Sequence, residues 1–153
     1  PLRRHEQIAV FYKQQPTYNP QFTKGKALHG KGKNYMKNIA KNNNYGEFKA
    51  IEDKRKGSTE KYPISILEFR KTHPSQAKHP TEKPIELLEN LIKTYSNEQD
   101  LILDSCIGSG STAVACINTN RRYIGFEINK KYYDIAMKRI EEINRIGGDK
   151  LVR

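Results

Sequence analysis

Apolar residues recur at regular spacing in the second half of the chain and predict an amphipathic helix near residue 85. Pro84 suits the first turn of this helix, because the N–H that proline lacks has no partner at that position. The residues that follow at three- and four-residue spacing are Ile85, Leu88, Leu91, Ile92 and Tyr95. Together they form one apolar face, which a helix must bury against another element.

Two short apolar runs further along the chain predict buried strands. Leu101–Leu103 is the first, and it ends at Asp104. The second strand is Arg122–Phe126, which ends at Glu127. Between the two strands, a loop that contains two glycines leads into a helix of small residues over about 111–118.

A last helix is predicted to follow the second strand. Asn129 suits its N-cap, the helix runs to about Ile146, and Gly147 and Gly148 are expected to end it. Its inward positions are predicted to be Tyr133, Ala136, Met137, Ile140 and Ile143. The order of elements is therefore helix, strand, helix, strand, helix, which is half of an open, Rossmann-like parallel α/β sheet.

The first half of the chain shows a weaker pattern. The apolar and aromatic run Glu6–Tyr12 predicts a buried strand, and Ile64–Phe69 predicts another. Between them, glycine, lysine and asparagine alternate without helical or strand periodicity, so this stretch is expected to be irregular. Pro74 and Pro80 bracket a connecting loop before the regular half begins.

The charge of the chain is concentrated in the irregular half. The net charge is +11, and residues 1–80 carry all of that excess, whereas residues 81–153 are balanced. Such an asymmetry is typical of a surface that binds a polyanion, most often nucleic acid. A lysine-rich solvated surface explains the same composition, so charge alone leaves both interpretations open.

Length and cysteine content restrict the class of protein. A chain of 153 residues predicts one domain, and its two cysteines, Cys106 and Cys116, predict neither a disulfide framework nor a metal site. No apolar run is long enough to cross a bilayer, so a cytoplasmic protein without a membrane partner is expected. Because the chain starts at Pro1 rather than Met, we expect it to be part of a larger protein.

The glycine loop and two acidic residues predict a ligand site. Gly108 and Gly110 lie where a strand turns into a helix, so that backbone N–H groups can approach a ligand closely. Glu127 ends the next strand, where a carboxylate can accept hydrogen bonds from ribose hydroxyls. A nicotinamide dinucleotide fits this glycine pattern too. Asp104, however, would repel a pyrophosphate and attract an ammonium group, which favours a different adenosine-containing ligand.

Three segments resemble motifs of the DNA methyltransferases that modify amino groups. His79–Pro84 resembles the motif H-P-T-x-K-P. Asp104–Thr112 resembles D-P-F-x-G-S-G-T-T, with serine, cysteine and serine as departures at positions 105, 106 and 111. Gly125, Glu127 and Tyr132 match G-x-E-x-x-x-x-Y. The order of the three motifs is that of the family's β-type arrangement, in which the catalytic motif and the target-recognition region come first.

This resemblance implies S-adenosyl-L-methionine as the cofactor, the class I methyltransferase form of the sheet, and a role for each matching residue. Asp104 would bind the methionine ammonium, and Glu127 the ribose hydroxyls. Thr81 and Lys83 would contact the carboxylate end, although an N-cap and a solvated side chain are the alternatives for these two. The loop residues that would line the cofactor are Gly108, Ser109 and Gly110.

The resemblance also implies a division of the chain and a partner. Residues 1–12 would be a strand of the methyltransferase core, 13–78 the target-recognition region, and 79–153 the cofactor-binding subdomain. Double-stranded DNA would be held by Lys and Arg within Lys13–Lys78, and no metal is implied. Base stacking is open to Tyr18, Tyr35, Tyr45 and Phe48, with core packing as the alternative that we expect for most of them.

The family's catalytic tetrapeptide, D/N/S-P-P-Y/F, is missing from the sequence. The nearest segment is Asn19–Phe22, which has Gln21 in place of the second proline and is interpreted as a turn. We therefore expect the C-terminal part of an enzyme that methylates adenine or cytosine amino groups, inactive on its own and completed by the rest of the parent chain. A fragment of an NAD-dependent oxidoreductase and a non-catalytic S-adenosylmethionine-binding module are the alternatives.

Overall fold

The computed structural model describes residues 5–27, 57–71, 73, 75 and 78–150, with side chains to residue 145. The chain forms two compact units. The smaller is Pro20–Ser65, and the larger combines the described residues up to Asn19 with those from Ile66 onward. Base stacking by Tyr35, Tyr45 and Phe48 concerns positions outside the described residues.

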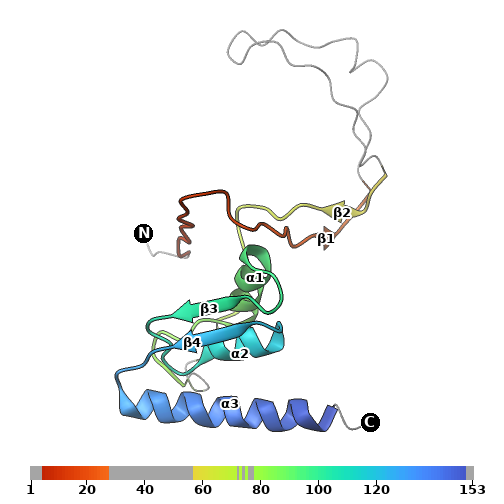
Figure 1. Cartoon of the computed structure of the whole chain (residues 1–153). Coiled ribbons are helices and arrows are strands. Elements are labelled where there is room, and N and C mark those ends of the chain that lie inside the picture. Colours follow the sequence, from red (N-terminus) through yellow and green to blue (C-terminus); the bar gives the residue numbers. More distant parts are fainter. Residues whose placement is uncertain (1–4, 28–56, 72, 74, 76–77, 151–153) are drawn as a thin grey trace, which may run out of the picture. The chain divides into compact units, whose positions relative to one another are not determined.

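The larger unit contains the alternating helices and strands that the sequence predicts (Figure 1). Strand β3 (Leu101–Asp104) pairs in parallel with strand β4 (Arg122–Gly125), so that Asp104 lies opposite Gly125. Three helices accompany the strands: α1 (Ile85–Tyr95), α2 (Ser111–Asn118) and α3 (Lys130–Lys150). The prediction of half a parallel α/β sheet is confirmed.

The core of the larger unit lies between the sheet and helices α1 and α2. Ile92, Ala115 and Cys116 are buried together, and partly buried side chains pack around them: Ile85, Leu88, Ile102 and Tyr123. Ile102 and Tyr123 are paired residues of β3 and β4, so they point to the same face of the sheet. The small residues of α2 allow α1 and the sheet to approach it closely.

The opposite face of the sheet is apolar and uncovered by any described residue. It carries the alternate positions of both strands, Leu101 and Leu103 in β3 and Ile124 in β4. Leu103 is 66% exposed and Leu101 is 52% exposed. A parallel sheet is normally buried on both faces, whereas this face is exposed in the part of the chain that the structure describes.

Helix α3 begins as predicted but differs in two respects. Asn129 accepts a hydrogen bond from the Lys131 N–H at 3.0 Å, which confirms it as the N-cap. The helix then continues through Gly147 and Gly148 to Lys150, so the prediction that the glycines end it is wrong. A glycine weakens a helix by about 1 kcal/mol relative to alanine, but it keeps the backbone hydrogen bonds.

The prediction of the inward face of α3 is also partly wrong. Tyr133 and Met137 are exposed, whereas Ala136 is buried. The packed stripe is turned by about one residue, with Tyr132 against His79 and with Arg139 reaching the glycine loop. This rotation brings a charged residue, rather than the apolar Met137, into the interior.

Two predicted strands in the irregular half are absent from the described structure. The run over residues 6–12 forms no strand, and Phe11 is 92% exposed. The run over residues 64–69 likewise forms none, and both Ile64 and Ile66 are exposed. A strand needs a neighbour for its backbone N–H and C=O groups, and neither run meets one among the described residues.

The smaller unit has a short antiparallel pairing within the region predicted to be irregular. Strand β1 (Thr23–Lys24) pairs with strand β2 (Glu60–Lys61), so two described segments that are distant in the sequence meet at this ladder. The Gly25 N–H extends the pairing with a hydrogen bond to the Thr59 carbonyl at 2.8 Å. Beside the ladder, the rings of Phe22 and Tyr62 lie 4.8 Å apart.

Candidate functional site

The loop from β3 to α2 has a backbone that glycine makes possible. Gly108 and Gly110 adopt φ values of +55° and +84°. The Gly110 N–H donates to the Ile107 carbonyl at 2.9 Å, which closes a tight turn before α2. The Ile107 N–H in turn donates to the Phe126 carbonyl at 3.0 Å, so the loop is tied to the residue that follows β4.

The two predicted acids lie at the same edge of the sheet, where both strands end, and each holds the loop. Asp104 accepts hydrogen bonds from the Thr112 hydroxyl at 2.6 Å and from the Cys106 N–H at 3.0 Å. Glu127 accepts the Gly108 N–H at 2.9 Å through Oε2 and the Asn129 N–H at 2.8 Å through Oε1. Each oxygen of a carboxylate has two lone pairs, so both acids retain acceptor capacity for a ligand.

An open hollow of about 360 Å³ lies at this edge. Its lining consists of Ser105, Cys106, Phe126, Glu127 and Ile128. Phe126 and Ile128 are exposed apolar side chains, and Glu127 adds a carboxylate between them. An apolar wall with one well-placed acceptor suits a flat, partly polar ligand such as a nucleoside.

The segment that precedes α1 lies against the other side of the loop. The His79 ring meets the Tyr132 ring edge-on at 4.2 Å, and a Cβ added to Gly108 would be 3.5 Å from the His79 ring. Nδ1 of His79 accepts the Thr81 N–H at 3.3 Å and is 3.1 Å from the Thr81 hydroxyl. Lys83 forms an ion pair with Glu6. Neither Thr81 nor Lys83 lines the hollow, so their assignment to a cofactor stays a prediction.

Two charged residues outside the predicted site, Glu82 and Arg139, contact the glycine loop from inside the protein. Glu82 and Arg139 form an ion pair at 3.2 Å, with side chains 5% and 12% exposed. Burial by itself raises the pKa of Glu82, but the Lys78 N–H, the Arg139 charge and the Ser109 hydroxyl outweigh burial and lower it. No local signal identifies this pair, because Glu82 occupies the variable position of its motif and its partner is far along the chain.

Ser109, which was predicted to line a cofactor, is itself buried at 2% exposure. Its hydroxyl donates to Glu82 at 3.1 Å, so the side chain points into the protein. The glycines and the acids are therefore brought together at one edge, while Ser109 connects that edge to the interior.

Asn19, in the segment closest to the missing tetrapeptide, has a structural use. Its backbone N–H donates to the Thr94 carbonyl at 2.7 Å, and its side-chain amide donates to the carbonyls of Lys93 at 3.2 Å and Ser96 at 3.1 Å. These carbonyls belong to the end of α1, where no intrahelical donors are available. The amide of Asn19 thus caps a helix.

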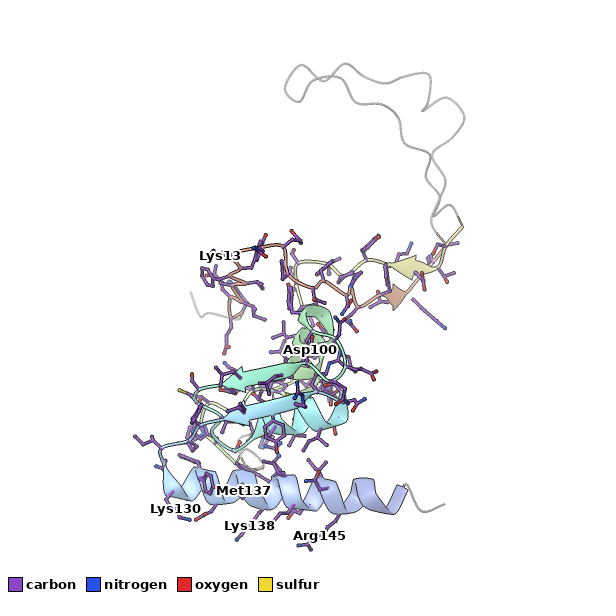
Figure 2. All side chains as sticks on the ribbon, in the orientation of Figure 1. Lys13, Asp100, Lys130, Met137, Lys138 and Arg145 are labelled. Carbon is purple, nitrogen blue, oxygen red and sulfur yellow. The ribbon has the colours of Figure 1, made fainter. Side chains whose placement is uncertain are left out.

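The described surface also carries positive charge on α3. Lys130, Lys138 and Arg145 project from this helix on the side away from the β3–β4 sheet (Figure 2). In the part of the chain that the structure describes, no group of His, Cys, Asp or Glu side chains is arranged to hold a metal ion. No helix in that part has the length and apolarity to cross a membrane.

Comparison with known proteins places these features in a family. A family model described as a DNA methylase, N6_N4_Mtase, matches residues 1–138. The type II methyltransferase M2.DpnII of Streptococcus pneumoniae is 36% identical over 108 residues, which cover 71% of this chain and 40% of that protein. The DNA adenine methyltransferase YhdJ of Escherichia coli is 30% identical, with coverages of 71% and 40%.

Two further matches cover less of this chain. The type II methyltransferase M.HpaI of Haemophilus parainfluenzae is 39% identical over 82 residues, and this chain spans only 26% of its length. The crystal structure of an M1.HpyAVI–SAM complex aligns with a TM-score of 0.43 at 33% identity, over 51% of this chain and 42% of that one. Since the family model spans most of the sequence, the chain belongs to the N6/N4 family of DNA methylases.

Proposed function

We propose that this chain forms the cofactor-binding part of an enzyme that transfers a methyl group from S-adenosyl-L-methionine to an exocyclic amino group of adenine or cytosine in DNA. The observation that carries the proposal is the pair of strand-end acids, Asp104 and Glu127, on either side of the glycine loop, in a chain of the DNA methylase family. The M1.HpyAVI relative was crystallised with SAM, which supports the same cofactor.

The residues present fit such a cofactor. Glu127 lines the hollow and has acceptor capacity for the two ribose hydroxyls, while Phe126 and Ile128 offer apolar surface to the adenine. Asp104 provides the negative charge that a methionine ammonium requires. Gly108 and Gly110 are buried, and a Cβ at either position would meet His79 or Ala136, so their assigned part is to allow the tight turn of the loop beside the hollow. Thr81 and Lys83 are assigned to its carboxylate end.

When bound, S-adenosylmethionine supplies an electrophilic methyl group on a positively charged sulfur. The task of this chain is to hold that group in one orientation and to keep the charged ends of the cofactor paired. Removal of the target base from the DNA stack and activation of its amino group require residues that this sequence lacks. We therefore infer that the chain alone does not methylate DNA.

The remainder of the enzyme is the proposed partner of the exposed sheet face. This chain spans only 26–40% of the length of the relatives described above. The uncovered positions Leu101, Leu103 and Ile124 form the apolar surface that further elements of a parallel α/β sheet would bury. Double-stranded DNA would contact the basic region within Lys13–Lys78, and the complex would act in the cytoplasm.

Calorimetry with S-adenosylhomocysteine and with NAD tests the cofactor. S-adenosylhomocysteine should bind and NAD should not, because Asp104 disfavours a pyrophosphate. Glu127→Gln should weaken binding, since it replaces one acceptor oxygen by a donor, whereas Glu142→Gln on the exposed surface of α3 is the matched control and should change nothing. Binding of NAD with no binding of S-adenosylhomocysteine would replace this proposal by the oxidoreductase alternative.

A non-catalytic module would also bind S-adenosylhomocysteine, so a second measurement separates it from an enzyme. Methyl transfer from labelled cofactor to DNA should be detected with the full-length protein and not with this chain. If the full-length protein binds the cofactor but methylates no DNA, the module is the correct interpretation.

A further inference from the structure

The buried ion pair Glu82–Arg139 joins three segments that are distant in the sequence. Glu82 precedes α1, Ser109 belongs to the glycine loop, and Arg139 lies in α3. Through its two oxygens, Glu82 binds Arg139 at 3.2 Å and the Ser109 hydroxyl at 3.1 Å. The Lys78 N–H adds a third hydrogen bond at 2.8 Å. The carboxylate is thus almost fully enclosed and fully paired.

Arg139 holds the same serine from the opposite side. Its guanidinium donates to the Ser109 carbonyl at 3.3 Å and to the Ser111 hydroxyl at 3.2 Å. Ser109 therefore forms a hydrogen bond to Glu82 through its hydroxyl and a hydrogen bond to Arg139 through its carbonyl. A residue held at both groups has little freedom to rotate. It is flanked by Gly108 and Gly110, whose lack of a Cβ would otherwise leave the backbone adaptable.

The opposite side of the loop faces the candidate cofactor site. Glu127 accepts the Gly108 N–H there, one residue away from Ser109. Ser105 and Cys106 of the loop line the hollow, so the shape of the hollow depends on Glu82 and Arg139 behind the loop and on Glu127 in front of it. Of these three charged residues, only Glu127 lines the hollow. The pair Glu82–Arg139 acts from inside the protein.

We propose that Glu82 and Arg139 are positioning residues that fix the glycine loop through Ser109 and thereby set the affinity for S-adenosylmethionine. This inference rests on the proposed cofactor, but it assigns the affinity to residues that do not touch it. A purely structural ion pair would contribute to folding and leave the affinity of the folded protein unchanged, so the two roles make different predictions.

The test compares affinity with stability in the full-length protein. Removing one partner leaves an uncompensated buried charge, so Glu82→Gln and Arg139→Met should lower the melting temperature. The double variant Glu82→Leu/Arg139→Met removes both charges and should recover much of that loss. Ser109 still lacks both partners in the double variant. The dissociation constant of the double variant for S-adenosylhomocysteine should therefore stay about tenfold higher than that of the wild type, in line with the loss of charged hydrogen bonds.

Glu89→Gln is the matched control. Glu89 is an acid of α1 that pairs with Lys93 at 3.9 Å and with Asn118 at 2.7 Å, and it has no part in the loop. Its substitution should leave the dissociation constant unchanged. Affinity is measured by calorimetry at a temperature where circular dichroism finds every variant folded.

The outcomes separate this inference from the proposed function. If the wild type binds S-adenosylhomocysteine and the double variant regains affinity together with stability, the pair acts only through folding and the positioning role is overturned. The same conclusion follows if Arg139→Met, which removes the hydrogen bond to the Ser109 carbonyl, binds as tightly as the wild type. If the wild type itself does not bind, the proposed function fails first, and the positioning role fails with it.

Discussion

Replacing Gly110 by alanine is expected to destabilise the larger unit by about 2–4 kcal/mol. The backbone at this position has φ +84°, and left-handed backbone costs a residue with a Cβ about 1–2 kcal/mol. The new Cβ would lie 3.0 Å from the Cβ and 3.2 Å from the Cα of Ala136 in α3, so the helix must move. Overpacking of this kind costs about 1–3 kcal/mol. Alanine returns about 0.4–1 kcal/mol by restricting the unfolded chain.

Gly108→Ala is the matched control for the backbone contribution. Gly108 also has a positive φ, of +55°, and belongs to the same loop. Its nearest neighbour would be the His79 ring at 3.5 Å, which is an ordinary contact. This variant should therefore lose only about 1 kcal/mol. The difference between the two variants measures the close packing of α3 against the loop.

Urea denaturation followed by circular dichroism gives both free energies of unfolding. The dependence on urea should be the same for the wild type and the two variants, because the surface exposed on unfolding is unchanged. Equal losses for Gly108→Ala and Gly110→Ala would refute the reasoning. They would mean that α3 can move away from the new Cβ without a loss of stability, and that the approach of Ala136 to Gly110 is not a constraint on the fold.

Three further predictions concern the polar groups of the larger unit. Because the folded-state pKa of Glu82 lies below the ordinary 4.5, its ionised form stabilises the fold fully above pH 4.5, and this contribution is lost as the pH falls through the folded-state pKa. The melting temperature of the wild type should thus exceed that of Glu82→Gln by a constant amount at neutral pH and by a smaller amount below pH 4.5. A difference in melting temperature that does not change with pH would contradict the ion pair. Burial raises the pKa of Cys116 to about 11, whereas Cys106 is exposed, so a thiol reagent should modify one cysteine in the native protein and both after denaturation. Rapid native modification of both would show that the core is open. Asn19→Ala should cost about 1 kcal/mol and speed amide hydrogen exchange in the last turn of α1, and unchanged exchange there would argue against the cap.

The regular half of the chain could be predicted from the sequence because its signals are local. The start of α1 follows from Pro84, and that of α3 follows from Asn129. Strands β3 and β4 follow from short apolar runs that each end at an acid, although β4 itself ends at Gly125, one residue before the predicted Phe126. Each of these signals lies within a few residues of the feature it specifies, so no knowledge of distant contacts is needed.

Apart from the end of α3, the failures depend on partners that are distant in the sequence. The runs over residues 6–12 and 64–69 have the composition of strands, yet strand formation depends on a neighbouring strand rather than on composition. The inward face of α3 was misjudged because apolar Met137 was preferred to Arg139, and the arginine is buried only because Glu82 is there to pair with it. A buried charge can be recognised from the sequence only when its partner is known.

The same dependence changes the interpretation of the two strand-end acids. Asp104 and Glu127 were selected as ligand contacts, but each one already holds the loop through two hydrogen bonds. A carboxylate that shapes the loop and also accepts hydrogen bonds from a ligand couples the conformation of the loop to ligand binding. Any movement of the loop would displace the acceptor of the ligand's hydrogen bonds. Glu82 and Arg139 then support this arrangement from the interior through Ser109. The site is better understood as one glycine loop held from two sides by carboxylates, of which only Glu127 lines the hollow.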